Sequence, residues 1–480
     1  MPAPRTGAPG HDQRFDVIIV GARCAGAALA IHLARAGKEV LVVDSAPLPG
    51  GPVASTHLIQ PPGMDELDAL GLGDQVRDLA PALTTVRMFF DEYSTEFSYG
   101  PGRAAHCLRR SGLDSRLQFA AGEAGATLIP RTRVVGVVRN PAGGVCGVDL
   151  RAEPGGRSRV LAPLVVGADG RHSSIAKLVG AEEYLGYEAP RACYWAYWQR
   201  PPSCDAHVIY NCFEGENARI VFPTDGELFV IATAPPVQRV GAWRDDHTTA
   251  YLADISSYAP IAELLDTDVP VSEVRGVVRN RYFFRASSGQ GWALIGDAGH
   301  HKDFGIGLGI SDALRDARAL ASAIVSGDPT AAERYWRQRD VERMELFHWS
   351  RDLGAPDRVN ALERLVGKRA GAAADVTARL GAVIDGQLSP YQLVPPSLAM
   401  RWAAVELGKG RVGPLREVLR TGARLLRSRR EVSRRRRLLR SVPVASPPAA
   451  VLPATVATQP ALDARRAPRT HGNKGASATK

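Results

Sequence analysis

The sequence lacks several features that would assign a class at once. No apolar run reaches the roughly 18 residues that a membrane-spanning helix needs. The first 14 residues contain no apolar segment of the kind found in signal peptides, and we therefore expect a cytoplasmic protein. A His-Glu-x-x-His zinc motif and a hydrolytic triad are also missing. These absences argue against a membrane span and against a zinc or serine hydrolase.

Cysteine is scarce, and its spacing does not indicate a metal site. No two cysteines form the closely spaced pair that zinc sites use, so we expect no metal. Cys204 and Cys212 are near enough in sequence to meet across a hairpin, but free buried thiols are the expected state in a reducing compartment. The six residues concerned are Cys24, Cys107, Cys146, Cys193, Cys204 and Cys212.

Acidic charge is scarce only near the C-terminus. Residues 407–440 contain 13 Lys and Arg against two Asp and Glu, and residues 441–480 contain five against one. The net charge of the whole chain is +10, so the first 406 residues have a net charge of −5. A mildly acidic body argues against a nucleic-acid groove, and we expect no nucleic-acid partner.

Helical spacing of apolar residues from Pro414 onward predicts an amphipathic basic helix packed on the acidic body. Its predicted apolar face is Leu415, Val418, Leu419, Gly422, Leu425 and Leu426. Contact with an anionic surface or an acidic carrier protein is the alternative role for this helix. The Pro- and Ala-rich residues 443–480 are predicted to be disordered.

The most informative stretch is residues 15–44, which predict a strand, a tight turn, a helix and a second strand. Val17–Val20 is a continuous apolar run, as expected for a parallel strand buried on both faces. Gly21 and Gly26 occupy the first and third glycine positions of a dinucleotide-binding turn, with Arg23 in the middle position. The free N–H groups of a helix that begins here favour a pyrophosphate. Asp44 ends the second strand, where a carboxylate can bind a ribose hydroxyl.

Two further turns follow predicted buried strands. Asp169-Gly170 comes directly after an apolar run, and Gly296-Asp297 comes after another. Glycines at 305, 307 and 309 then precede a predicted helix, so that backbone N–H groups can approach a ligand closely. Each of these motifs alone is weak, but three in this order are specific.

The order and separation of the three motifs resemble the FAD-dependent monooxygenases with the para-hydroxybenzoate hydroxylase-like fold. That family also includes flavin halogenases and geranylgeranyl-reductase-like enzymes. The resemblance covers roughly residues 15–345. It implies an α/β fold with a Rossmann-type FAD-binding domain, an inserted antiparallel-sheet substrate domain and a helical C-terminal extension.

The resemblance also implies a domain division. A flexible lead (1–14) precedes a discontinuous FAD-binding domain (15–85, 105–185 and 285–345). The substrate domain takes 86–104 and 186–284, and a basic helical region (346–442) comes before the tail.

The resemblance further implies roles for individual residues. The ADP half of FAD would be bound by Gly21, Ala22, Arg23, Gly26 and Asp44. Arg110 would lie near the diphosphate, and Val134 would contact adenine through its backbone. Asp169 belongs to the middle motif, which serves both FAD and the nicotinamide cofactor, and Asp297 would bind the ribityl chain. Gly307 and Gly309 lie in the loop that would face the isoalloxazine.

One departure from the family pattern concerns the last motif. Many members have a proline shortly after its histidine, whereas this chain reads His300-His301-Lys302-Asp303-Phe304. His301 and Asp303 are therefore candidate proton donors or substrate contacts, with a solvent-exposed loop as the alternative. His57 is a third candidate, because family loops approach the flavin in this region. No catalytic residue is assigned beyond these three candidates.

The resemblance implies FAD-dependent hydroxylation or epoxidation of an apolar or aromatic small molecule, in secondary metabolism, using NAD(P)H and oxygen through a flavin hydroperoxide. Candidate walls of the substrate site are Tyr194, Trp195, Tyr197, Trp198 and Phe222. The first alternative is a flavin-dependent reductase of isoprenoid double bonds. A halogenase ranks third, because the halogenases' Trp-x-Trp-x-x-Ile-Pro motif is missing. A non-catalytic carrier that keeps the fold without flavin is the remaining alternative.

Overall fold

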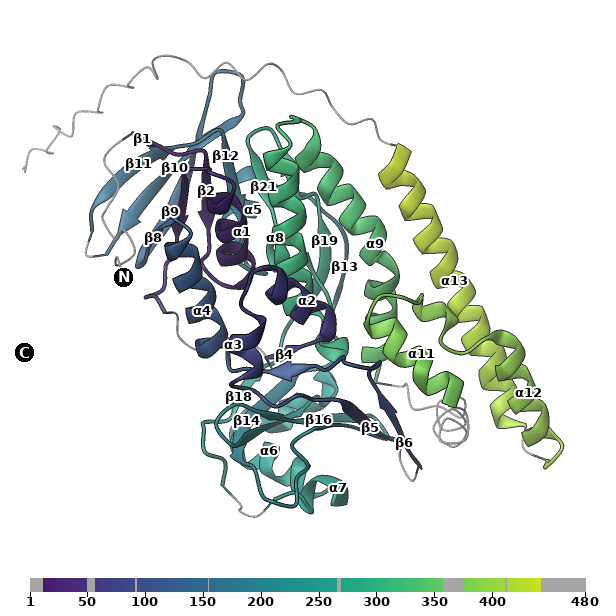
Figure 1. Cartoon of the computed structure of the whole chain (residues 1–480). Helices are drawn as coiled ribbons and strands as arrows, with labels where there is room; N and C mark the ends of the chain where they lie inside the picture. The colour runs from purple at the N-terminus through teal and green to yellow at the C-terminus, as the bar shows by residue number, and fades with distance from the viewer. Residues whose placement is uncertain are drawn as a thin grey trace, which may run out of the picture.

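The computed structural model describes residues 12–49, 57–90, 93–153, 155–265, 269–356, 374–410 and 412–441. The predicted tail at 443–480 and most of the predicted lead lie outside these residues. Figure 1 shows a parallel sheet with helices against one face, a second large sheet at one end, and a group of C-terminal helices along the side.

The first motif folds as β2 (Val17–Val20), α1 (Cys24–Arg35) and β3 (Val40–Val43). These strands belong to a six-stranded sheet whose neighbours run parallel, apart from one edge strand. Its order is β20 (Ser288–Gly289), β21 (Trp292–Leu294), β12 (Leu164–Gly167), β2, β3 and β8 (Thr127–Ile129). The three sequence motifs follow β2, β12 and β21, and parallel strands bring such turns to the same edge of a sheet.

The two faces of this sheet are covered differently, because successive side chains of a strand point to opposite sides. Val17 and Ile19 pack in the core formed with α1, α4 (Arg110–Glu123) and α8 (Gly309–Val325). Ile18 and Val20 face a core shared with a four-stranded sheet and α5 (Ser174–Val179). That sheet has the order β1 (Gln13–Arg14), β11 (Arg157–Leu161), β10 (Val145–Ala152) and β9 (Thr132–Arg139).

The second large sheet has seven strands drawn from distant parts of the chain. Its order is β18 (Arg275–Val277), β14 (Cys193–Gln199), β17 (Leu228–Thr233), β16 (Asn217–Thr224), β15 (Val208–Glu214), β5 (Thr85–Phe90) and β6 (Tyr93–Ser98). All pairs are antiparallel except β15 with β5. The predicted α/β fold with an inserted antiparallel sheet is thus confirmed.

Only one face of this sheet turns toward the part of the chain that contains the parallel sheet. The other face packs on α6 (His247–Ser256) and α7 (Ala259–Ala262), and Tyr194 and Trp198 point there. The indole N–H of Trp198 donates to the hydroxyl of Tyr251 on α6 at 3.0 Å. The inner face carries Trp195 and Phe222.

Short elements join these parts. A three-stranded sheet contains β13 (Glu183–Glu188), β19 (Arg281–Arg285) and β22 (His300–His301), and β4 (Leu58–Ile59) pairs with β7 (His106–Cys107). Helices α2 (Pro61–Ala69) and α3 (Gly73–Arg77) follow β4. The 3₁₀ segments are η1 (Val237–Trp243), η2 (Gly296–Ala298), η3 (Phe304–Ile306) and η4 (Pro390–Gln392).

The described C-terminal helices are α9 (Ala331–Gly354), α11 (Ala374–Ile384), α12 (Pro396–Leu407) and α13 (Gly413–Ser441). The predicted basic helix is present as α13, and Leu415 of its predicted apolar face packs beside Ala399 and Ala403 of α12. The side chains of Val418 and Leu425 lie outside the described residues, and the rest of the predicted face is wrong. Leu419 and Leu426 are 60% and 57% exposed, while Val432, further along, is buried. Among the described residues, no helix combines the length and apolar character that crossing a bilayer requires.

Candidate functional site

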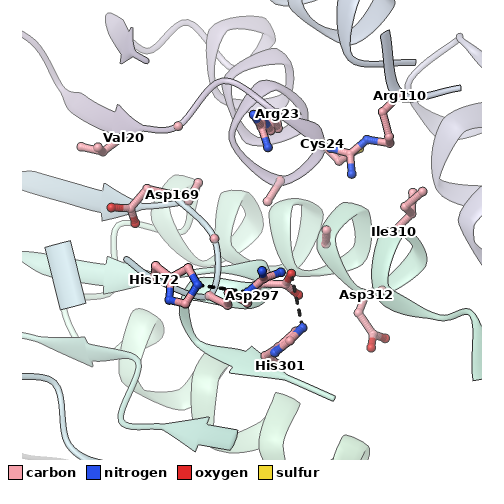
Figure 2. A pocket seen from close by; sticks show the side chains of 18 of the residues that line it. Val20, Arg23, Cys24, Arg110, Asp169, His172, Asp297, His301, Ile310 and Asp312 are labelled. Atoms are coloured by element: carbon pink, nitrogen blue, oxygen red, sulfur yellow. Dashed lines mark hydrogen bonds and ion pairs between the residues drawn. The ribbon is translucent and has the colours of Figure 1, made fainter. Parts of the chain in front are cut away.

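A large cavity of about 710 Å³ lies at the carboxyl ends of the parallel strands. We call it the polar cavity. It brings together most of the predicted cofactor residues, namely Gly21, Arg23, Asp44, Arg110, Val134, Asp169, Asp297, Gly307 and Gly309. Ala22 and Gly26 do not line it. Figure 2 shows Arg23, Cys24 and Arg110 along one side of the cavity, facing Asp297 and His301.

The turn after β2 requires glycine at two positions for reasons of backbone packing. Gly21 has a φ of +104°, and a Cβ there would lie 2.5 Å from the carbonyl oxygen of Ala168. A Cβ on Gly26 would lie 1.8 Å from the carbonyl oxygen of Gly21. Arg23 precedes α1 in an extended conformation, with φ −92° and ψ −167°, which any residue adopts. The arginine in place of the middle glycine therefore leaves the turn intact.

Asp44 fixes the same turn from the end of β3. One carboxylate oxygen accepts a hydrogen bond from the backbone N–H of Ala22 at 2.8 Å, and the other accepts from Ala46 at 2.8 Å. Each oxygen retains a lone pair for a further donor. Ala22 thus belongs to the site through its backbone, whereas Asp44 also lines the cavity.

Arg110 places a buried positive charge beside the start of α1. Its guanidinium donates to a carboxylate oxygen of Asp114 at 2.9 Å, and the thiol of Cys24 donates to the same oxygen at 3.3 Å. Burial raises the pKa of Cys24 well above its usual range, so the thiol stays neutral. With Arg23 and the N-terminus of α1, Arg110 gives this side of the cavity the chemistry of a diphosphate site.

Asp169 supplies an unused acceptor. One of its oxygens accepts from the backbone N–H and the hydroxyl of Ser174 at 2.6 Å each, which fixes the start of α5. The other oxygen is buried without a hydrogen-bond partner among the described residues. Buried acceptors are rarely left unpaired, so a donor on a bound group fits here.

The third motif places two side chains from η2 and β22 opposite α1. Asp297 is 46% exposed, and the Nε2 atom of His301 lies 4.0 Å from its carboxylate. The Nδ1 atom of His301 lies 2.9 Å from the backbone oxygen of Arg281, which fixes the ring. A carboxylate and an imidazole at the wall of a polar cavity can accept and donate hydrogen bonds to a hydroxyl-rich chain.

The loop after β22 is buried, and the predicted alternative of a solvent-exposed loop is wrong. His300, Lys302 and Asp303 are at most 7% exposed. Asp303 accepts from the backbone N–H of Gly305 at 2.9 Å, and burial raises the pKa of its carboxyl group to about 6. Burial, together with the nearby Arg315, lowers the pKa of Lys302 to about 7.

The interpretation of the sequence missed the partner of Lys302. The ammonium of Lys302 pairs with Asp312 on α8, and the Nε2 atom of His300 lies 3.5 Å from the same carboxylate. Asp316, one helical turn further along α8, accepts from the backbone N–H of Gly296 at 3.1 Å. Two acids four residues apart on one helix face were the signal that could have revealed this cluster.

His57 is buried at the wall of the polar cavity and adopts a φ of +69°. Its ring stacks on Tyr197 with centroids 5.7 Å apart. Burial lowers the pKa of His57 to about 3, so the imidazole is neutral at physiological pH. His57 can therefore accept or donate a hydrogen bond there, but it does not act as a cation.

A second cavity of about 140 Å³ lies between the inner face of the seven-stranded sheet and the loop at η3. We call it the apolar cavity. It shares three lining residues with the polar cavity: Leu58, Phe304 and Gly307. Of the five predicted aromatic walls, only Phe222 lines it. Its apolar walls include Val86, Met88, Phe97 and Ile209 from the sheet, and Trp349, Leu353, Leu380 and Ile384 from α9 and α11. Polar side chains also line it, namely Gln60, Tyr99, Asn211 and Arg219.

Residues 14–345 match the family described as the FAD binding domain. The chain belongs to this family. The resemblance seen in the three motifs is thereby confirmed, and the protein is a flavin-dependent oxidoreductase. The site fits the cofactor, since it combines the glycine turn, cations at the helix N-terminus and an unpaired buried acceptor. Among the described residues, no His, Cys, Asp or Glu side chains are grouped as they would be around a metal ion.

Relatives with different activities are similar to this chain. The menaquinone reductase of Mycolicibacterium smegmatis is 28% identical over 354 residues, which are 67% of this chain and 79% of the relative. The protoasukamycin 4-monooxygenase of Streptomyces nodosus subsp. asukaensis is 27% identical over 372 residues, 70% of this chain and 87% of the relative. The solved structure of the flavin-dependent brominase Bmp2 has a TM-score of 0.67 at 16% identity and covers 83% of this chain and 100% of its own, which shows a shared fold.

Proposed function

We propose that the protein is an FAD-dependent monooxygenase that hydroxylates or epoxidises an apolar or aromatic small molecule in secondary metabolism, with NAD(P)H as co-substrate. The observation that carries this proposal is the contact between the two cavities. The polar cavity fits FAD, and the apolar cavity shares the wall residues Leu58, Phe304 and Gly307 with it. An apolar molecule held there lies against the same loop as the flavin.

In this proposal the polar cavity holds FAD along its length. Ala22, Arg23 and Asp44 bind the ADP half at the turn that Gly21 and Gly26 make possible, and Arg110 neutralises the diphosphate. Val134 contacts adenine through its backbone, since β9 forms that end of the cavity. Hydrogen-bond acceptors for the rest of the cofactor are Asp169 and Asp297. NAD(P)H and six free buried cysteines favour a reducing, cytoplasmic compartment.

Bound FAD supplies the transfer of electrons from NAD(P)H to oxygen and of one oxygen atom to the substrate. The chain orients this chemistry. Gly307, with a φ of +65°, and Gly309 at the start of α8 let the backbone approach the ring, and the N-terminus of α8 stabilises negative charge on it. The apolar cavity orients the substrate and excludes water from it.

The protic groups of the apolar cavity favour the oxygenase over a reductase. Reduction of a carbon–carbon double bond needs a proton as well as a hydride. Among the described lining residues, the ionisable groups are Tyr99, Cys193 and Arg219. Burial raises the pKa of Cys193 to about 12 and also raises the pKa of Tyr99 well above its usual range. None of the three readily gives up a proton near neutral pH, and the acid Asp303 lines the polar cavity instead of the apolar one. Oxygen insertion needs no acid at the substrate carbon.

The runner-up is a flavin-dependent reductase of isoprenoid double bonds, which the likeness to the menaquinone reductase favours. The experiment is turnover of a panel of apolar and aromatic compounds by the FAD-loaded enzyme under labelled oxygen gas, with an anaerobic control. The proposal predicts one labelled oxygen atom in the product and no anaerobic turnover. A product two mass units heavier than its substrate, formed equally well without oxygen, would replace it with the reductase.

A further inference from the structure

Helix α13 has two unlike faces over its 29 residues. The inner face packs on α9 and the body through buried Ser428 and Val432. Arg435 donates to the backbone oxygen of Tyr184, and Arg436 donates to Glu345 at 2.6 Å. These contacts fix the helix to the protein, so its opposite face has a defined direction. Figure 1 shows α13 running along the outer edge of the molecule.

The outer face contains only arginine among its described, exposed charged side chains. Those arginines are Arg416, Arg420, Arg427, Arg430, Arg434, Arg437 and Arg440, whereas Arg429 donates to the backbone oxygen of Tyr391 in η4. Residues 419 and 426 lie seven residues apart, and 430, 434 and 437 follow at intervals of four, four and three, so all five share one side of the helix. A helix of this length extends the basic face over about 43 Å.

Apolar side chains are exposed between these arginines. Leu419 and Leu426 are 60% and 57% exposed on the outer face of α13. The neighbouring helix α12 also exposes Met400 and Leu407, which are 45% and 42% exposed and lie two helical turns apart. Single exposed apolar residues are ordinary, but large ones alternating with arginine on adjacent helices mark an interaction surface.

We propose that the outer face of α13 binds the surface of an anionic phospholipid bilayer. The arginines pair with lipid phosphates, and Leu419 and Leu426 enter the boundary between headgroups and acyl chains. A nucleic acid offers phosphates but no apolar layer for the leucines. The first 406 residues have a net charge of −5, so an anionic surface repels the body and attracts α13. This charge asymmetry orients the protein with α13 against the bilayer.

The test uses the full-length, FAD-loaded protein and does not depend on the substrate or the reaction. Cosedimentation with vesicles of phosphatidylcholine mixed with phosphatidylglycerol is compared with vesicles of phosphatidylcholine alone. We expect binding to the anionic vesicles only, weakening as salt rises. The triple variant Arg427→Gln, Arg430→Gln, Arg434→Gln should lose about fivefold in partitioning per arginine. Circular dichroism and flavin absorbance establish that each variant is folded.

Two further variants separate the partners. Leu419→Ser with Leu426→Ser should weaken vesicle binding at any salt concentration and leave any binding to a DNA duplex unchanged. The matched control replaces exposed arginines on the opposite edge of the molecule, Arg139→Gln, Arg151→Gln and Arg157→Gln, and should bind vesicles like the parent. Equal binding to both kinds of vesicle, no binding to either, or an equal loss in the control would overturn the proposal. Leucine variants with undiminished vesicle binding would do so as well.

Discussion

The polar and apolar cavities meet at one loop but are built in opposite ways. The polar cavity gathers turns that follow three neighbouring parallel strands, and its functional groups are glycines and charged residues at strand ends. The apolar cavity takes single side chains from β4, the seven-stranded sheet, η3, α9 and α11. The first construction leaves motifs in the sequence, and the second leaves none, because most contributors are ordinary apolar residues from elements far apart in the sequence.

The largest effect is expected for Gly26→Val, which should disrupt the polar cavity, whereas the matched change Gly37→Ala should leave the cavity intact. Gly26→Val puts side-chain atoms where even a Cβ would lie 1.8 Å from a backbone oxygen. We expect it to destabilise the fold by at least about 3 kcal/mol and to abolish FAD retention. Gly37→Ala, at a φ of +78° with open space around it, should cost about 1 kcal/mol and keep FAD. Denaturant unfolding and flavin absorbance measure both, and a stable, yellow Gly26→Val protein would contradict the packing argument.

The next largest effect is expected for a variant that alters the apolar cavity alone. Met88→Trp adds an indole to a cavity of about 140 Å³. We expect turnover of the preferred substrate to fall at least tenfold, with FAD content unchanged. Arg87→Trp adds the same ring to the opposite face of β5 and should leave turnover near that of the parent protein. If Met88→Trp lost FAD and substrate turnover together, the two cavities would not be separate functional units.

A smaller effect tests the buried acid between the cavities. In the folded protein the pKa of Asp303 is about 6, whereas the ordinary value for this carboxyl group is 3.8. Between pH 3.8 and pH 6 the folded state therefore binds more protons than the unfolded state. The stability of the folded protein falls as pH rises through this range. Asp303→Asn removes this penalty and keeps an acceptor for Gly305. We expect the variant to gain about 3 kcal/mol relative to the parent at pH 8, and less than about 1 kcal/mol at pH 4. Urea unfolding at both pH values measures the difference, and a gain that did not depend on pH would refute it.

The smallest effect concerns Asp297, which is half exposed at the wall of the polar cavity. Asp297→Ala should weaken FAD binding by about 1 kcal/mol, through loss of a hydrogen bond to the ribityl chain. Asp297→Asn keeps an acceptor and should bind FAD more tightly than the alanine variant. Fluorescence titration of the apoprotein with FAD measures both constants. Unchanged affinity in Asp297→Ala would remove this residue from the site.

The difference between the two cavities also explains which parts of the structure could be predicted from the sequence. The turn at Gly21 and the acid Asp44 were predictable, because their chemistry depends on the local backbone geometry, which the residue spacing of the motif determines. The aromatic walls were predicted poorly, since alternation along β14 tells which residues share a face but not which face turns inward. Tyr194 and Trp198 turned out to pack on α6.

The pairing of Lys302 with Asp312 was missed for a related reason. Lys302 directly follows β22 and Asp312 lies on α8, so their pairing depends on how the loop between them folds back. For α13, helical periodicity identified the helix but not which of its faces the body covers. Each error concerned a tertiary contact, and two of the elements involved, β22 and α6, were not predicted from the sequence.

The central claim is that the flavin and the substrate meet at Gly307. The most direct measurement is a crystal structure of the FAD-loaded protein with an apolar substrate identified in the oxygen-labelling screen. The account predicts isoalloxazine density beside Gly307 at the end of the polar cavity and substrate density in the apolar cavity against Phe222 and Met88. Substrate bound outside the apolar cavity, or a flavin ring remote from Gly307, would contradict it.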